Sequence, residues 1–239
     1  MERRDVQAGV VEIPIRGAGP ANVLDSDAMA RLEVALIAAE RRGAAGAILH
    51  GPPGRFAAGA DLATLERMGG AEAFEFGREG SRLFRRMERT SLWLAAAVDG
   101  HCIGGGFDLV LACDLVLATP RATFRHPGTR FGFPTTYGGN RRLPARVGTS
   151  PATAMLLQGR FVSAVEAHEA GLVTELVPAD ELRSRANERL ARWIAAASPP
   201  VARSLQAVFR TSARLPLHTG VALEEAALRA ASLAGDRSC

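Results

Sequence analysis

The chain has 239 residues and a net charge of +4; 47% of its residues are hydrophobic and 23% are charged. This composition is typical of one globular domain with room for an appendage, and it excludes a disordered chain. All 29 Lys and Arg positions are arginines, which excludes Schiff-base chemistry and a P-loop because both need a lysine. The positive charge favours acidic or phosphorylated partners, although a coding bias towards Ala and Arg explains the same content more simply.

The cysteines and the N-terminus indicate the compartment. Cys102, Cys113 and Cys239 are an odd number without the spacing of a disulfide framework, so we expect reduced thiols. The first residues lack the apolar core of a signal peptide, and no run approaches the roughly 20 apolar residues that a membrane span needs. The sequence therefore predicts a soluble, cytoplasmic protein without a membrane partner.

Strand-like and helix-like segments alternate along the first half of the chain. Apolar patterns predict strands over 10–15, 45–49, 92–98 and 115–118, and helices from Asp25 or Ser26 onwards, over 72–89 and over 104–112. The segment 51–62 is rich in Gly, Pro and Ala and predicts a loop. This alternation predicts an α/β core with mainly parallel strands.

The last third is predicted to be mostly helical. Ser163 and Glu166 have the spacing of a capping box, and Gly171 is placed to end the helix that they start. A short strand follows over 172–177, and then helices over 180–197, 199–211 and 218–233. Ser198 and Pro199 form a typical start for the second of these helices.

Two glycine-containing loops are the candidate functional segments. The first is FAAGADL at 56–62, and the second is GHCIGGGFD at 100–108, between a strand and a helix. Glycines let a backbone bring its N–H groups close to a ligand, and a helix start favours an anion. One N–H group from each loop would form an oxyanion hole. The second loop lacks the G-x-G-x-x-G pattern, which disfavours dinucleotide binding.

Together with further motifs, this pair of loops resembles the enoyl-CoA hydratase/isomerase family, the crotonase superfamily. The other matching segments are PANVL at 20–24, the pair Cys113-Asp114, GGNRRL at 138–143, and a stretch from Gly159 to Pro178. The resemblance implies an α/β spiral of ββα repeats over residues 1–195. It also implies a C-terminal helical region over 196–239 that covers the site and builds a homotrimer or hexamer.

The resemblance further implies the ligand and its binding residues. Members bind acyl-CoA thioesters and hold the enolate oxygen on two backbone N–H groups, which fall here on Ala60 and Gly105. The other substrate-binding positions implied by the match are Ala58, Asp61, Leu62 and Gly104. We expect no metal and no cofactor, with coenzyme A present as part of the substrate.

The acid/base residues fit the resemblance less closely. Asp108 stands where relatives keep a first glutamate and is one methylene shorter, and a misplacement near 1 Å can cost about 100-fold in rate. Gly128 stands at the second glutamate and cannot transfer a proton. Thr136 stands where some isomerases keep an aspartate. Three nearby side chains are candidate substitutes, each with a purely structural alternative: His126, His101 and Tyr137.

The predicted function is therefore hydration or double-bond isomerisation of an enoyl-CoA through a thioester enolate. A decarboxylase and a catalytically degenerate acyl-CoA-binding protein are the alternatives. The family segment that carries a CoA-binding lysine has no match here, so Arg203 or Arg210 is a candidate substitute. Nucleic-acid binding is disfavoured because the arginines are dispersed, without a basic stripe that contains aromatic residues.

Overall fold

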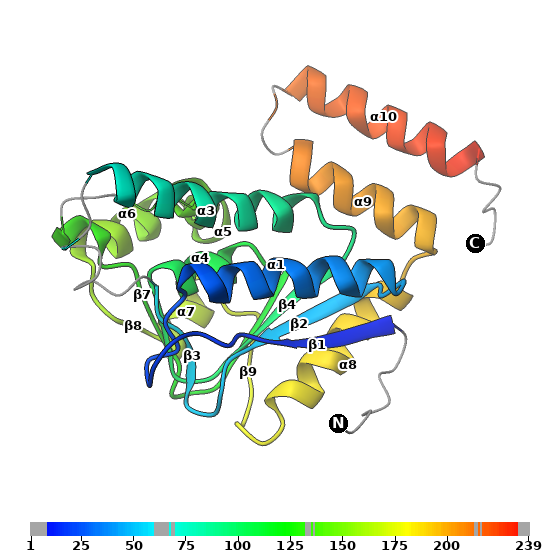
Figure 1. Ribbon diagram of the computed structural model, residues 1–239. Helices are drawn as coiled ribbons and strands as arrows, with labels where there is room; N and C mark the ends of the chain where they lie inside the picture. The colour runs from blue at the N-terminus through cyan, green and yellow to red at the C-terminus, as the bar shows by residue number, and fades with distance from the viewer. Residues whose placement is uncertain are drawn as a thin grey trace.

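The computed structural model describes residues 9–59, 67, 70–131, 135, 137–212, 215 and 217–233. Within these ranges, the strands form two sheets (Figure 1). The first has the order β1 (Val10–Pro14), β2 (Gly46–His50), β4 (Trp93–Val98), β6 (Leu115–Ala118) and β9 (Glu175–Leu176), and all neighbours are parallel. The second has the order β3 (Arg55–Ala57), β5 (His101–Ile103), β7 (Thr123–Arg125) and β8 (Val162–Ser163), with β8 antiparallel to β7.

The chain passes from the first sheet to the second in each repeat. The strand pairs β2–β3, β4–β5 and β6–β7 each place one strand in each sheet. These pairs precede the helices α3 (Gly70–Arg89), α4 (Gly105–Leu111) and α5 (Gly139–Val147), respectively. This repetition confirms the predicted α/β class and the spiral of ββα units.

Helices cover both faces of the five-stranded sheet. Alternate side chains of a strand point to opposite faces, so Ile48 packs in the cluster with Leu190 of α8 (Leu182–Ala195). Leu49 packs on the other face, in the cluster that contains Leu36 of α1 (Ser26–Arg41). The central strands β4 and β6 are apolar throughout because both of their faces are covered.

The connection from β4 to β5 is fixed by one carboxylate. Asp99 accepts hydrogen bonds from the Gly54 N–H at 2.7 Å and the Thr119 hydroxyl at 2.9 Å, and it is ion-paired with Arg121 at 2.6 Å. Hydrogen bonds from Arg121 are the main reason that the pKa of Asp99 falls to about 2. This aspartate therefore ties together the three points where the chain turns from one sheet towards the other.

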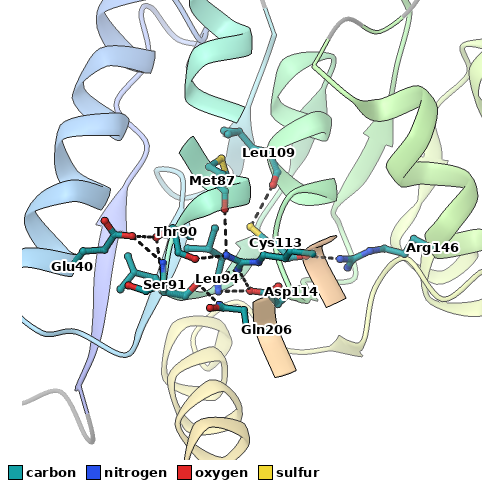
Figure 2. Close-up of polar contacts among 12 residues, drawn as sticks. Glu40, Met87, Thr90, Ser91, Leu94, Leu109, Cys113, Asp114, Arg146 and Gln206 are labelled. Carbon is teal, nitrogen blue, oxygen red and sulfur yellow. Dashed lines mark hydrogen bonds and ion pairs between the residues drawn. The ribbon is translucent and has the colours of Figure 1, made fainter. Parts of the chain in front are cut away.

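The C-terminal helices α9 (Pro199–Ser212) and α10 (Leu217–Leu233) extend beyond the two sheets (Figure 1). Polar side chains anchor α9 to the segment before β4 (Figure 2). Gln206 donates to the Leu92 carbonyl at 2.8 Å, and Arg210 donates to Leu92 O at 3.0 Å and to Asp114 Oδ2 at 2.6 Å. Arg210 therefore holds α9 on the core, and these contacts disfavour it as the arginine that binds the CoA phosphates.

Most predicted elements are present near their predicted bounds, and several short ones were not predicted. The segment 51–62 is not a continuous loop, because it contains β3, and the strand predicted over 172–177 is reduced to β9. The elements that the sequence did not predict are β5, β7, β8, α6 (Thr149–Gln158) and the 3-10 helix η2 (Gly128–Phe131). The helix α5 begins within the segment 138–143, which the family resemblance indicates as a helix start. The Ser163 capping box is confirmed at the start of α7 (Ala164–Glu169). In the ranges described, no helix is long and apolar enough to cross a membrane.

Candidate active site

The two glycine loops meet in the structure. A Cβ atom placed on Gly59 would lie 2.6 Å from the backbone nitrogen of Gly105, so the two backbone segments approach at a distance that only glycine allows. The parallel pairing of β3 with β5 sets this approach, because Ala57 is the partner of Cys102. Ala58 and Gly104 lie on the same two segments, whereas the predicted residues Ala60, Asp61 and Leu62 fall outside the described residues.

Gly105 presents a backbone N–H at the start of α4. It is the first residue of the helix, so the helix itself offers no carbonyl four residues earlier to accept from its N–H group. The preceding residue, Gly104, donates instead to the Arg125 carbonyl of β7 at 2.9 Å. The loop therefore directs one amide into the sheet and places the next at the helix start, beside Gly59.

Asp108 lies one turn further along α4 and is 1% exposed. Its Oδ2 atom is 3.3 Å from His126 Nε2, and its Oδ1 atom accepts a hydrogen bond from the Thr135 hydroxyl at 2.9 Å. Gly139 at the start of α5 packs directly on this carboxylate, and a Cβ there would collide with Asp108 Oδ1. The structure thus confines a carboxylate between polar partners from two segments of the chain, with the start of α5 packed against it.

Tyr137 lies beside both Gly105 and Asp108. Its ring stacks on Phe84 with the centroids 4.8 Å apart, and its Cε2 atom would be 3.5 Å from a Cβ placed on Gly105. Burial raises the pKa of the Tyr137 hydroxyl, and the charges of Asp108 and Glu79 raise it further. Tyr137 is therefore a neutral hydroxyl at physiological pH.

The remaining candidates are not part of this cluster. Gly128 begins η2 and supplies no carboxylate. His101 is exposed on β5, and its Nδ1 atom is 2.8 Å from the Thr123 hydroxyl oxygen rather than near Asp108. Burial raises the pKa of the Cys102 thiol, and it raises that of Cys113 to about 12, so neither thiol is an activated nucleophile. Thr136 and Cys239 lie outside the described residues.

A separate cleft of about 910 Å³ lies where the chain leaves β2 and enters β3. Four arginines line it: Arg16, Arg55, Arg121 and Arg183. Arg121 is ion-paired with Asp99, and Arg183 is ion-paired with Glu12. Arg55 donates to the backbone carbonyl of Pro20, and this neutral partner does not balance its positive charge. Sequence reasoning missed this cleft because the four arginines are spread over more than 160 residues and converge only in the fold.

Comparison with known proteins agrees with this architecture. The family model for enoyl-CoA hydratase/isomerase matches residues 5–234. The short-chain-enoyl-CoA hydratase of Clostridium acetobutylicum is 30% identical over 208 residues, which are 86% of this chain and 79% of that protein. The crystal structure of an enoyl-CoA hydratase from Bacillus anthracis matches with a TM-score of 0.86 at 29% identity, over 93% of this chain and 86% of that one.

A second solved structure gives the same result. The enoyl-CoA hydratase/isomerase from Cupriavidus metallidurans CH34 matches with a TM-score of 0.85 at 30% identity, over 95% of this chain and 86% of that one. The family model covers nearly the whole chain, and these two solved structures share its fold over 93% and 95% of its length. The chain therefore belongs to the enoyl-CoA hydratase/isomerase family of enzymes, the crotonase superfamily.

Proposed function

We propose that this protein binds an acyl-CoA thioester, stabilises its enolate and uses Asp108 to shift a double bond within an enoyl-CoA. One observation supports this proposal most directly. Gly105 and Asp108 lie one turn apart on α4, and the amide of Gly105 meets the other glycine loop at Gly59. The second amide of the oxyanion hole is assigned to Ala60 by the family resemblance.

The chemistry needs one base and one group of donors for the enolate. Asp108 removes a proton from the carbon next to the thioester carbonyl, and negative charge develops on the thioester oxygen. Backbone amides aimed at that oxygen stabilise it, and a single donor of this kind contributes about 3–4 kcal/mol. The same carboxyl then delivers the proton to the γ-carbon, so a single carboxylate completes the isomerisation and no group is needed at Gly128.

Hydration is the second candidate, because the relatives described above are named hydratases. It requires a group that activates water, and Gly128 removes the carboxylate that relatives keep there. Decarboxylation uses the same enolate without a base at the α-carbon. Binding without turnover is the remaining alternative.

The deciding experiment identifies products in D₂O. The protein is incubated with β,γ-unsaturated, α,β-unsaturated, saturated and α-carboxylated acyl-CoA thioesters, and products are followed by proton NMR and mass spectrometry. We expect the β,γ-unsaturated substrate to move its double bond and the saturated one to exchange its α-proton. Addition of water to the α,β-unsaturated substrate without isomerisation favours hydratase function, and loss of CO₂ favours a decarboxylase. Binding by calorimetry without exchange or turnover contradicts the proposal.

The arginine-lined cleft is our proposed site for the CoA phosphates. It lies at the start of β3, and Gly59 lies only two residues beyond the end of that strand, so one strand links the cleft to the enolate site. Arginine binds phosphate oxygens through paired N–H donors. We expect Arg55→Ala to raise KM for a CoA thioester about tenfold and leave KM for the matching pantetheine thioester unchanged. Equal effects on both thioesters would place the phosphates elsewhere.

Gly59→Ala tests the approach of the two loops. The added methyl would lie 2.6 Å from the Gly105 nitrogen and must displace that amide or its loop. We expect kcat for α-proton exchange to fall about 100-fold, the loss associated with a misplaced oxyanion donor. Gly77→Ala in α3 is the matched control because a Cβ there has open space around it. Full activity in Gly59→Ala would show that this contact does not position the donor.

The assembly and the location of the protein stay predictions. A homotrimer or hexamer is favoured by an exposed apolar stripe on α9, formed by Val201, Leu205 and Phe209 at intervals of four residues. The cytoplasmic location and the absence of a nucleic-acid partner continue to rest on composition.

A further inference from the structure

We propose that His126 is a positioning residue for Asp108, holding the carboxylate in place by its Nε2–H group. This inference rests on the proposed function, in which Asp108 is the base. The two side chains come from different elements: Asp108 from α4 and His126 from the residue that follows β7. Their 3.3 Å contact is buried, since the exposed fractions are 1% and 8%.

The backbone holds His126 in place at both of its sides. The Arg125 carbonyl accepts from the Gly104 N–H, so the residues directly before His126 and directly before Gly105 are bonded to each other. Arg125 Nε also donates to the Gly159 carbonyl at 2.8 Å, which ties the end of β7 to the end of α6. Pro127 follows His126 and disfavours a helical backbone there. His126 is thus fixed relative to the same amide that we assign to the enolate oxygen.

The carboxylate has its donors on more than one side. The Thr135 hydroxyl lies 2.9 Å from Oδ1 and 3.0 Å from Oδ2, and His126 adds a second donor at Oδ2. A buried ionised carboxylate needs such donors, because burial without them disfavours its charge. Gly139 packs against Oδ1, so a longer side chain at position 108 would press on the start of α5. The shorter aspartate therefore has a pocket of its own size.

Two other titratable side chains lie close enough to Asp108 to feel its charge, the Cys102 thiol on β5 and the Tyr137 hydroxyl. Burial raises the pKa of both groups, so both stay protonated and neither competes with Asp108 for the α-proton. The hydrogen bond from His126 therefore acts on a carboxylate with no second base beside it among these groups.

The test compares His126→Gln and His126→Leu with His101→Gln as the matched control, using α-proton exchange of a saturated acyl-CoA. His126→Gln keeps an N–H donor at this position, whereas His126→Leu has none. We expect His126→Leu to lower kcat about 10- to 100-fold with KM within twofold. His126→Gln is expected to keep most of kcat. His101→Gln, at an exposed position, should match the wild type in rate.

Two results would overturn this role for His126. Wild-type rates in both variants would make it a packing residue, and equal losses in His126→Gln and His126→Leu would show that hydrogen-bond donation is not its contribution. A readout independent of turnover separates this inference from the proposed function: the ¹⁵N and proton shifts of His126 Nε2 should change in Asp108→Asn. If the wild type exchanges no α-proton while this shift still changes, the proposed function fails and the coupled pair stands.

Discussion

Asp108→Asn is expected to lower the rate of α-proton exchange and of double-bond shift by about 10²- to 10⁴-fold, the usual contribution of a positioned general base. The amide has nearly the shape of the carboxylate and keeps an oxygen that accepts from Thr135 and His126. The variant should therefore fold and bind acyl-CoA with little change in KM. The measurement is exchange in D₂O followed by NMR, with thermal unfolding as the check on folding.

Asp108→Glu is the companion variant. It keeps the carboxylate but adds a methylene where Gly139 already contacts Oδ1, so we expect partial activity and a lower melting temperature. If Asp108→Asn is as active as the wild type, another group removes the proton. If Asp108→Glu is more active than the wild type, the pocket around Asp108 is larger than the packing of Gly139 indicates.

Local signals predicted the parts of the fold that depend on neighbours in sequence. The Asp25 cap is present, with its side chain accepting from the Ala28 N–H, because a cap needs only residues within one turn. The apolar runs of β2, β4 and β6 were predicted for the same reason. The three-residue strands β3, β5 and β7 are too short to show a period of two, and they exist because they pair with one another. The helix α5 starts at a glycine and contains Pro144, both of which point away from a helix in the sequence.

In the candidate site, too, the motifs were predictable from sequence, whereas the contacts between distant segments were not. The two glycine loops and Asp108 were predicted from motifs, and the structure brings Gly59, Gly105 and Asp108 together. The choice among His126, His101 and Tyr137 was not available from sequence, because it depends on which residues reach α4 from other elements. Thr135 and Gly139 were missed as site residues since their role is a contact with Asp108 across the fold. For the same reason the sequence could not show that Arg210 holds α9 on the core, because its partner Asp114 lies 96 residues away.

Arg210→Met is expected to have the largest effect on stability. The guanidinium of Arg210 donates to the carbonyls of Thr90 at 2.6 Å and Leu92 at 3.0 Å, and it pairs with Asp114, with both side chains mostly buried. Its loss leaves a mostly buried carboxylate unpaired, which costs about 2–3 kcal/mol after allowance for the remaining solvent contact. For a chain of this size the melting temperature should fall by about 5–10 °C.

The matched control is Arg203→Met, which removes an exposed arginine from the same helix and should change the melting temperature little. The substitution removes contacts between α9 and the core, and Gln206 keeps one of them through its bond to Leu92 O. The core should therefore remain folded in Arg210→Met while α9 and α10 detach more often, so limited proteolysis should cut first near residue 198. Combining Arg210→Met with Asp114→Asn in a double-mutant cycle should give a coupling of about 1 kcal/mol or more. Additive effects in that cycle would show that the carbonyl contacts, and not the ion pair, hold α9 on the core.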